Sequence, residues 1–219
     1  MSSSIFREGA PHGLLRPMYD DGFAIEPGLV YPEFAAELLD ELKIHGKYAD
    51  EAAVLGRGPE VKHDSEILHR LHGMPRLAEY RQGLNDAITE VSGFDHEHLT
   101  YLTVRACPVE RMSSNIHRND SAAGPWLVAL TVAGSGSINM YRNDVIEQDE
   151  EIVLRGNGTD PEPFVSSPMD VGGAWGIYSK EWSAPHAGGP NTSPDPKVLV
   201  LLYGWYALDR YPHKNQAAD

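Results

Sequence analysis

The sequence predicts one α+β domain with a mostly β core, in which a helical first half precedes a sandwich or small barrel of short strands. Two observations predict this class. Apolar residues recur at three- and four-residue steps before Gly93, and short β-forming runs separated by glycine and proline follow it. The 219 residues suit a single domain spanning 1–219, and no internal repeat divides them.

The first half opens with residues 1–22, whose serines, prolines and glycines indicate an irregular arm. Residues 23–93 then form a strand and a helical annex. The strand lies within 22–30 and ends in a turn. Helices are expected from Pro32 to just before Gly46, from 65 to 71 and from 75 to 91, where Gly93 ends the last one.

The second half, residues 94–208, is rich in β-forming residues, and 209–219 is a tail. In its first run, alternation places Leu99, Tyr101 and Thr103 on one face. The glycines around Ser135 predict a hairpin, and 157–170 reads as a long polar loop of the kind that often forms a functional lid. The expected strands lie within 98–109, 125–134, 137–142, 150–156, 172–179 and 196–208.

Composition and charge narrow the class of partner. Eighteen basic and 32 acidic residues give a net charge of −14, and no Lys/Arg cluster is present to track a phosphate backbone. We therefore expect a small-molecule substrate and no nucleic acid. No apolar run approaches the roughly 20 residues that span a bilayer, so no membrane association is expected. Cys107 is the only cysteine, which suits a reducing compartment and predicts a cytoplasmic protein.

Two histidines occupy positions at which a barrel could bring them together. His117 precedes a strongly β-forming run and His186 precedes the last strand. Asn119 and Asp120 follow the first histidine closely. Two imidazoles and one carboxylate on one face of a metal leave three positions open, which is the arrangement of non-haem iron(II) oxygenases. The absence of cysteine ligands argues against a structural zinc site.

The order of these features resembles the iron(II)/2-oxoglutarate-dependent oxygenases. The likeness covers most of residues 22–206: the segment GFAIEPGLVYPEFAAELLDEL, a helical annex, a histidine and carboxylate at a strand edge, then a histidine and a basic residue before the last strand. It implies a double-stranded β-helix, a jelly-roll or cupin-like barrel, with an N-terminal helical annex. It also implies Fe(II), 2-oxoglutarate and dioxygen as cofactor and cosubstrates, and hydroxylation of an unactivated C–H bond of an amino acid or natural-product intermediate.

The resemblance implies roles for particular residues. His117, Asp120 and His186 would bind iron, while Lys197 would hold the distal carboxylate of 2-oxoglutarate and Tyr101 would help to bind the cosubstrate. The family pattern is His-x-Asp, yet this chain has Asn119 in the carboxylate position. A turn or bulge would be needed to bring Asp120 back towards the metal.

Three other interpretations stay open. A halogenase would use the same centre with halide in place of the carboxylate. A non-catalytic barrel-fold binding protein would have kept the fold and lost the chemistry, and Asn119 favours it. A cupin-like metalloenzyme that does not use 2-oxoglutarate would bring more histidines into the first strands. Substrate contacts are expected from Arg118, Asn119 and Trp182, and Arg105 and Arg111 could also contact a carboxylate.

Overall fold

A computed structural model describes residues 5–45, 74–93, 96–108, 125–141, 162–179, 186–189 and 198–208. The helices among them are α1 (Ala10–Asp21), α2 (Pro32–His45) and α5 (Pro75–Ser92). The strands are β1 (Phe23–Glu26), β2 (His96–Pro108), β3 (Trp126–Ala133), β4 (Gly136–Met140), β5 (Val165–Met169), β6 (Ala174–Tyr178), β7 (His186–Gly189) and β8 (Val198–Leu208).

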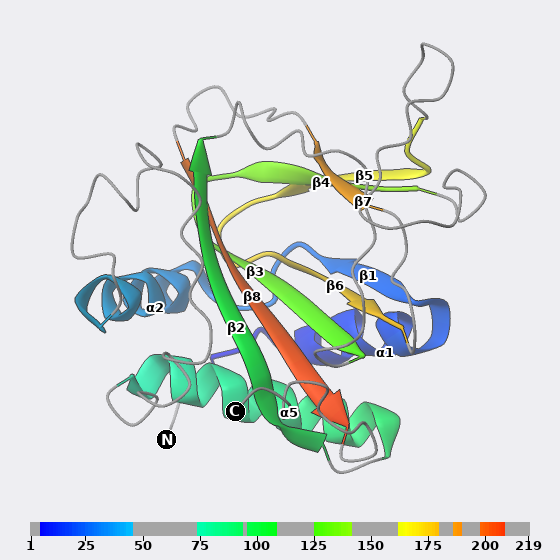
Figure 1. Cartoon of the computed structure of the whole chain (residues 1–219), viewed down its shortest axis with the longest axis horizontal. Helices are drawn as coiled ribbons and strands as arrows, with labels where there is room; N and C mark the ends of the chain where they lie inside the picture. The colour runs from blue at the N-terminus through cyan, green and yellow to red at the C-terminus, as the bar shows by residue number, and fades with distance from the viewer. Residues whose placement is uncertain are drawn as a thin grey trace, which may run out of the picture.

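The described strands form two antiparallel sheets. The large sheet has the order β1-β6-β3-β8-β2 and the small sheet has the order β5-β4-β7. The three helices lie against one side of the large sheet, and the small sheet lies on its other side (Figure 1). The predicted α+β class with a mostly β core and an N-terminal helical annex is therefore confirmed.

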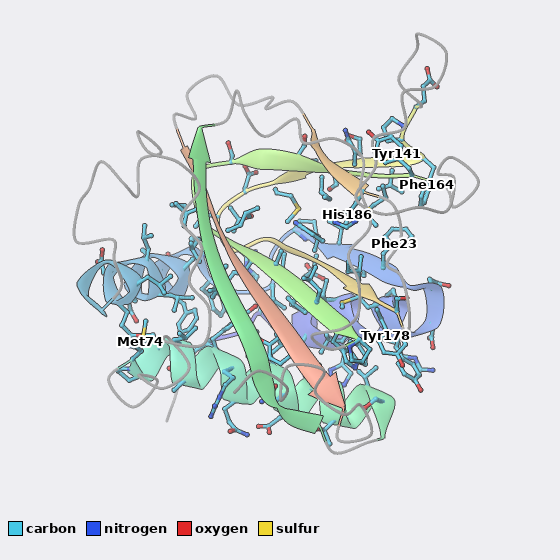
Figure 2. The ribbon with its side chains drawn as sticks, in the orientation of Figure 1. Phe23, Met74, Tyr141, Phe164, Tyr178 and His186 are labelled. Atoms are coloured by element: carbon cyan, nitrogen blue, oxygen red, sulfur yellow. The ribbon has the colours of Figure 1, made fainter. Side chains whose placement is uncertain are left out.

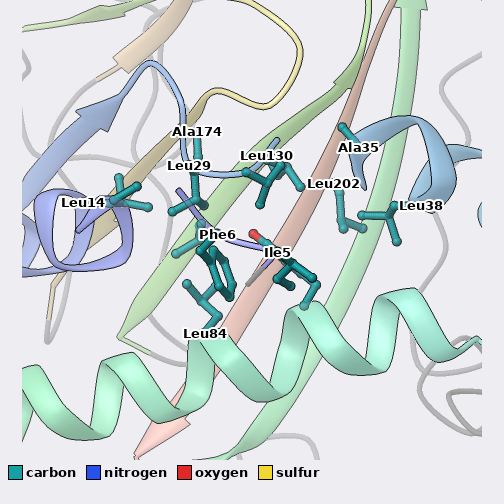
Figure 3. Packing of buried hydrophobic residues seen from close by; sticks show 14 of the residues in the cluster. Ile5, Phe6, Leu14, Leu29, Ala35, Leu38, Leu84, Leu130, Ala174 and Leu202 are labelled. Atoms are coloured by element: carbon teal, nitrogen blue, oxygen red, sulfur yellow. The ribbon is translucent and has the colours of Figure 1, made fainter. Parts of the chain in front are cut away.

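Two hydrophobic clusters hold these layers together. The larger one joins the helices to the large sheet, and Figure 3 shows Phe6 between Leu84 of α5 and Leu130 of β3. The smaller one lies between the sheets and contains Leu127, Ala129, Ile138, Met140, Met169, Trp175 and Ile177. Because adjacent residues of β3 belong to opposite clusters, this strand is buried on both faces.

The N-terminal arm expected over residues 1–22 is wrong from Ala10 onwards, because α1 occupies Ala10–Asp21. Ala10, Leu14, Leu15 and Met18 recur at helical spacing and are buried. Pro11 stands in the first turn, where a proline is tolerated, and Gly22 ends the helix in a left-handed conformation. Tertiary packing of this apolar stripe outweighs the local signal of serine, proline and glycine.

The other two described helices confirm the sequence signals. α2 begins at Pro32, and α5 ends at Gly93, which is left-handed with φ 69°. Glu41 of α2 accepts hydrogen bonds from the backbone N–H groups of Arg76 and Leu77 at 2.8 and 2.9 Å. A carboxylate at a helix N-terminus satisfies exposed N–H groups and complements the helix dipole, so α2 fixes the start of α5.

The hairpin predicted around Ser135 is wrong. β3 pairs with β6 and β8 in the large sheet, whereas β4 pairs with β5 and β7 in the small sheet. Both hydrogen-bonding edges of β3 are thus occupied, and the chain crosses between the sheets at Gly134, whose φ is 76°.

The loop expected over 157–170 is also partly wrong, because β5 occupies Val165–Met169. Its Pro168 lacks a backbone N–H, which an edge strand tolerates, and β5 is at the edge of the small sheet. The strand expected within 150–156 and the helix expected within 65–71 lie outside the described residues. Among the described helices, none combines the length and apolar character that crossing a bilayer requires.

Two tyrosines, Tyr80 and Tyr206, are buried between α5 and the large sheet. Their ionisation should destabilise the folded protein at high pH. Burial raises the pKa of Tyr80, and burial together with the neighbouring Tyr80 raises the pKa of Tyr206 well above its usual value. A raised pKa in the folded state gives stability that is complete below about pH 10, the ordinary tyrosine pKa, and is lost as the pH rises further. We expect Tyr80→Phe to move the alkaline unfolding midpoint, followed by circular dichroism, to higher pH.

The matched control is Tyr31→Phe, because Tyr31 is 44% exposed. It should leave the midpoint unchanged. The account of Tyr80 fails if both variants unfold at the pH of the wild-type protein.

Gly172 occupies a position where a side chain should destabilise the fold. It has φ +86°, and a Cβ placed there would lie 2.5 Å from the backbone oxygen of Val30. Since both the conformation and the space exclude a side chain, we expect Gly172→Ala to lower the free energy of unfolding by about 1–3 kcal/mol in urea denaturation. Gly93→Ala, which changes a left-handed glycine with open space around it, should cost less. An equal cost at both positions would show that contact with Val30 is unimportant.

Candidate functional site

The space between the two sheets contains one of the two predicted histidine ligands. His186 is the first residue of β7 and pairs in register with Met140 of β4. Cross-strand partners share a face of a sheet, and Met140 belongs to the cluster between the sheets. His186 is only 2% exposed, so its imidazole lies in the interior of the sandwich (Figure 2). The sequence predicted this residue just before the last strand, whereas it opens a short strand of its own.

Trp175 of β6 contacts His186 across this space. The ring centroids are 5.2 Å apart and the planes are inclined by 51°. Trp175 is buried and pairs in register with Ile25 of β1 and Ala129 of β3. The indole therefore projects from the middle of the large sheet and restricts the orientation of the imidazole.

One side of the sandwich is closed by an aromatic contact. Phe23 of β1 meets Phe164, which precedes β5, edge to face at a centroid distance of 5.3 Å. β1 and β5 are edge strands of the large and small sheets, so the pair joins two edges that share no hydrogen bonds. Figure 2 shows both rings near His186. Phe164 is nevertheless 44% exposed, which places this contact at the surface, beside the histidine.

The two ends of the space between the sheets differ. At one end, residues 170–173 carry the chain from β5 to β6, and the backbone of Thr131 exchanges hydrogen bonds of 2.9 Å with Gly172 and Gly173. At the other end, β4 finishes at Met140 and β7 begins at His186. The histidine thus lies at the end remote from this crossover.

The predicted site residues are only partly described. Tyr101 lies in β2, in register with Trp205 of β8, and a register shift separates it from Leu99. Leu99 pairs with Tyr206 and Tyr101 with the adjacent residue Trp205, so the regular alternation expected from Leu99 to Tyr101 is interrupted. His117, Arg118, Asn119, Asp120, Trp182 and Lys197 lie outside the described residues.

Sequence reasoning missed the residues that surround His186. No local pattern singles out Trp175, because the sequence does not show which side of β6 faces a histidine eleven positions later. The contact between Phe23 and Phe164 joins segments far apart in the chain, so it had no sequence signal. Among the described residues, no group of three metal-binding side chains occurs, and His186 is the one predicted ligand that they include.

No protein-family model matches the sequence. No curated protein matches it significantly either.

Solved structures share its fold. A prolyl-4-hydroxylase of Pseudomonas putida has a TM-score of 0.54 and 13% identity, over 95% of this chain and 99% of its own. The non-haem α-ketoglutarate-dependent epimerase SnoN of nogalamycin biosynthesis has a TM-score of 0.53 and 16% identity, over 97% and 91%. The carbocyclase SnoK of the same biosynthesis, also described as non-haem and α-ketoglutarate-dependent, has a TM-score of 0.53 and 13% identity, over 96% and 88%. The resemblance to iron(II)/2-oxoglutarate-dependent oxygenases is therefore confirmed at the level of the fold.

Proposed function

We propose that this chain is an iron(II)- and 2-oxoglutarate-dependent oxygenase that hydroxylates a small molecule. The fold that it shares with SnoN and SnoK supports the class, and His186 supports the position of the metal. A buried imidazole between two sheets is a suitable iron(II) ligand. The observation that carries the proposal is the pattern by which the strands pair.

Three strand pairs are nested around one point of the chain. β2 pairs with β8, β3 with β6 and β4 with β5, so that each pair encloses the next. The midpoint of every pair falls at or between Ile152 and Val153. Examples are Tyr101 with Trp205, Ala129 with Trp175, and Asn139 with Ser166.

β7 has no described partner in this nested pattern. It lies between β6 and β8 in the chain, so its partner should lie between β2 and β3, in residues 109–125. The position that mirrors His186 about Ile152 or Val153 falls between Arg118 and Asp120. Among the described strands, β7 is an edge strand of the small sheet. The nesting therefore supports a double-stranded β-helix in which His117 and Asp120 lie beside His186.

The residues of this proposed site suit iron(II). Two imidazoles and the carboxylate of Asp120 would hold the ion on one face, and Trp175 restricts the imidazole of His186. When bound, iron(II) supplies the activation of dioxygen. The apolar residues between the sheets exclude bulk water, and Tyr101 and Lys197 remain the sequence-based candidates for binding 2-oxoglutarate.

The substrate is proposed to be an amino acid or a natural-product intermediate in the cytoplasm. The net charge of −14 disfavours polyanions. Hydroxylation is the simplest outcome, although the similar structures include an epimerase and a carbocyclase. Arg118, Asn119 and Trp182 are the proposed substrate contacts. A halogenase remains the second candidate, because Asn119 occupies the family's carboxylate position.

An anaerobic titration of the metal-free protein tests the proposal. Iron(II) followed by 2-oxoglutarate should produce a visible charge-transfer band that requires both additions. His117→Ala and His186→Ala should abolish the band, because each removes a metal ligand, while Asp120→Ala should weaken it more than Asn119→Ala. His12→Ala is the matched control, since the His12 side chain is 51% exposed on α1.

Absence of the band from the wild-type protein would contradict the proposal. A band that survives in His117→Ala would contradict the nested pairing. If Asp120→Ala has no effect and chloride alters the spectrum, the halogenase reading is favoured.

Tryptophan fluorescence provides an independent prediction about the position of the metal. A paramagnetic ion held by His186 would lie close to Trp175, whose ring centroid is 5.2 Å from that of the imidazole. Cobalt(II), used as a stable substitute for iron, should quench part of the emission, and Trp175→Phe should reduce the quenched amplitude. Trp126→Phe is the control, because Trp126 belongs to the helix-facing cluster. Equal quenching in all three proteins would place the metal elsewhere.

A further inference from the structure

A group of polar side chains lies in the interface between α5 and the large sheet. Tyr80 and Asn85 of α5 are only 3% and 6% exposed, and Arg81 is half-buried. The Tyr80 hydroxyl, the Arg81 Nε and both amide atoms of Asn85 are buried, and none of these atoms has a hydrogen-bond partner in the described structure. The interface therefore contains four polar atoms that protein groups leave unsatisfied.

These side chains surround one place in the interface. Arg81 and Asn85 are four residues apart, so they are neighbours on one face of the helix. Tyr206 of β8 is buried and belongs to the helix-facing cluster, as Tyr80 does. Burial raises the pKa of Tyr206, Tyr80 raises it further, and Arg81 lowers it. Since such influences act over short distances, the polar ends of Tyr80 and Arg81 lie close to the Tyr206 hydroxyl.

Arg81 lacks a carboxylate partner within the described part of the chain. Each carboxylate on α5 contacts a different side chain instead: Glu79 contacts Arg76, Asp86 contacts Gln82, and Glu90 contacts His12. Taking part of a guanidinium out of water is unfavourable unless an opposite charge offsets the loss of hydration. The positive charge of Arg81 thus indicates a negatively charged ligand at this place.

The hydrogen-bonding capacity of these groups also suits an anion. The Arg81 Nε, the amide nitrogen of Asn85 and the Tyr80 hydroxyl can all donate, and only Oδ1 of Asn85 is restricted to accepting. Water would satisfy the donors but would leave the charge of Arg81 unbalanced. Because the neighbouring Leu84 is fully buried in the helix-facing cluster, close packing favours a monatomic ion over a larger one. The net charge of −14 opposes anions at long range, but salt screens that field over about 10 Å at ordinary ionic strength.

We propose that Tyr80, Arg81 and Asn85 form a binding site for one halide ion, chloride in ordinary salt solutions, between α5 and the large sheet. The half-buried side chain of Arg81 gives the ion a route from solvent. A bound ion would hold α5 against the sheet, so the stability of the protein should depend on chloride. The site is independent of the proposed function, because α5 and the small sheet that carries His186 lie on opposite sides of the large sheet (Figure 1).

Thermal unfolding of the full chain without added metal tests this proposal. The melting temperature is measured at constant ionic strength while sodium chloride or sodium bromide replaces sodium gluconate. In the wild-type protein it should rise with halide concentration in a saturable way, because the ion binds the folded state. Arg81→Gln should weaken the apparent halide affinity about tenfold, since a hydrogen bond from a charged group is lost. Arg16→Gln is the matched control, because it removes the same charge from a side chain that is 62% exposed on α1.

Asn85→Asp provides a second test, because it supplies the negative charge from the protein itself. The new carboxylate would lie one turn from Arg81, where it should pair with the guanidinium and replace the ion. We therefore expect this variant to melt in gluconate at a temperature no lower than the wild-type protein does, and to show no response to halide.

Crystals grown in bromide give the position of the ion by anomalous diffraction. One bromide should contact the Arg81 Nε and the Tyr80 hydroxyl. An ordered water molecule alone at this place would overturn the proposal. An equal halide response in the wild-type protein, Arg81→Gln and Arg16→Gln would also overturn it, because that result reports a general effect of salt. A halide response that persists in Asn85→Asp would have the same consequence.

Discussion

Burial of the large sheet on both faces is the constraint on which the rest of the structure depends. β3 lies at its centre, and its residues alternate between the helix-facing cluster and the cluster between the sheets. The helices α1, α2 and α5 must cover one face, because that face is apolar. The small sheet covers the other face. Each covering layer depends on the position of the large sheet, so the helices stabilise the site without contributing a described residue to it.

The interface between the large sheet and the small sheet is not purely apolar. The space between the sheets holds the buried imidazole of His186 and the buried hydroxyl of Thr131 among apolar side chains. Removing each polar group from water costs free energy of folding, and apolar residues of similar size would avoid this desolvation cost. Such local exceptions to consistent packing are expected at functional sites. The two exceptions lie on different sheets, His186 on β7 and Thr131 on β3.

The sequence was informative where a signal is local and poor where partners are distant. α2 begins at Pro32 and α5 ends at Gly93 as predicted, because proline and glycine act on their own backbone. α1 was missed because tertiary burial of Leu14 and Met18 outweighs serine, proline and glycine nearby. The hairpin at Gly134 was wrong because occupancy of both edges of β3 is a property of the sheet. Residue type and position make His186 a candidate metal ligand, and this stays a prediction, whereas Trp175 acquires significance only from the register between strands.

The central claim is that nested strand pairing brings the segment around His117 beside β7. A crystal structure of the protein with manganese(II), a redox-stable substitute for iron(II), and 2-oxoglutarate tests it most directly. The account predicts one metal ion coordinated by the imidazoles of His117 and His186, with residues 117–120 adjacent to β7. A structure in which residues 117–120 lie away from β7, with His186 not bound to metal, would contradict it.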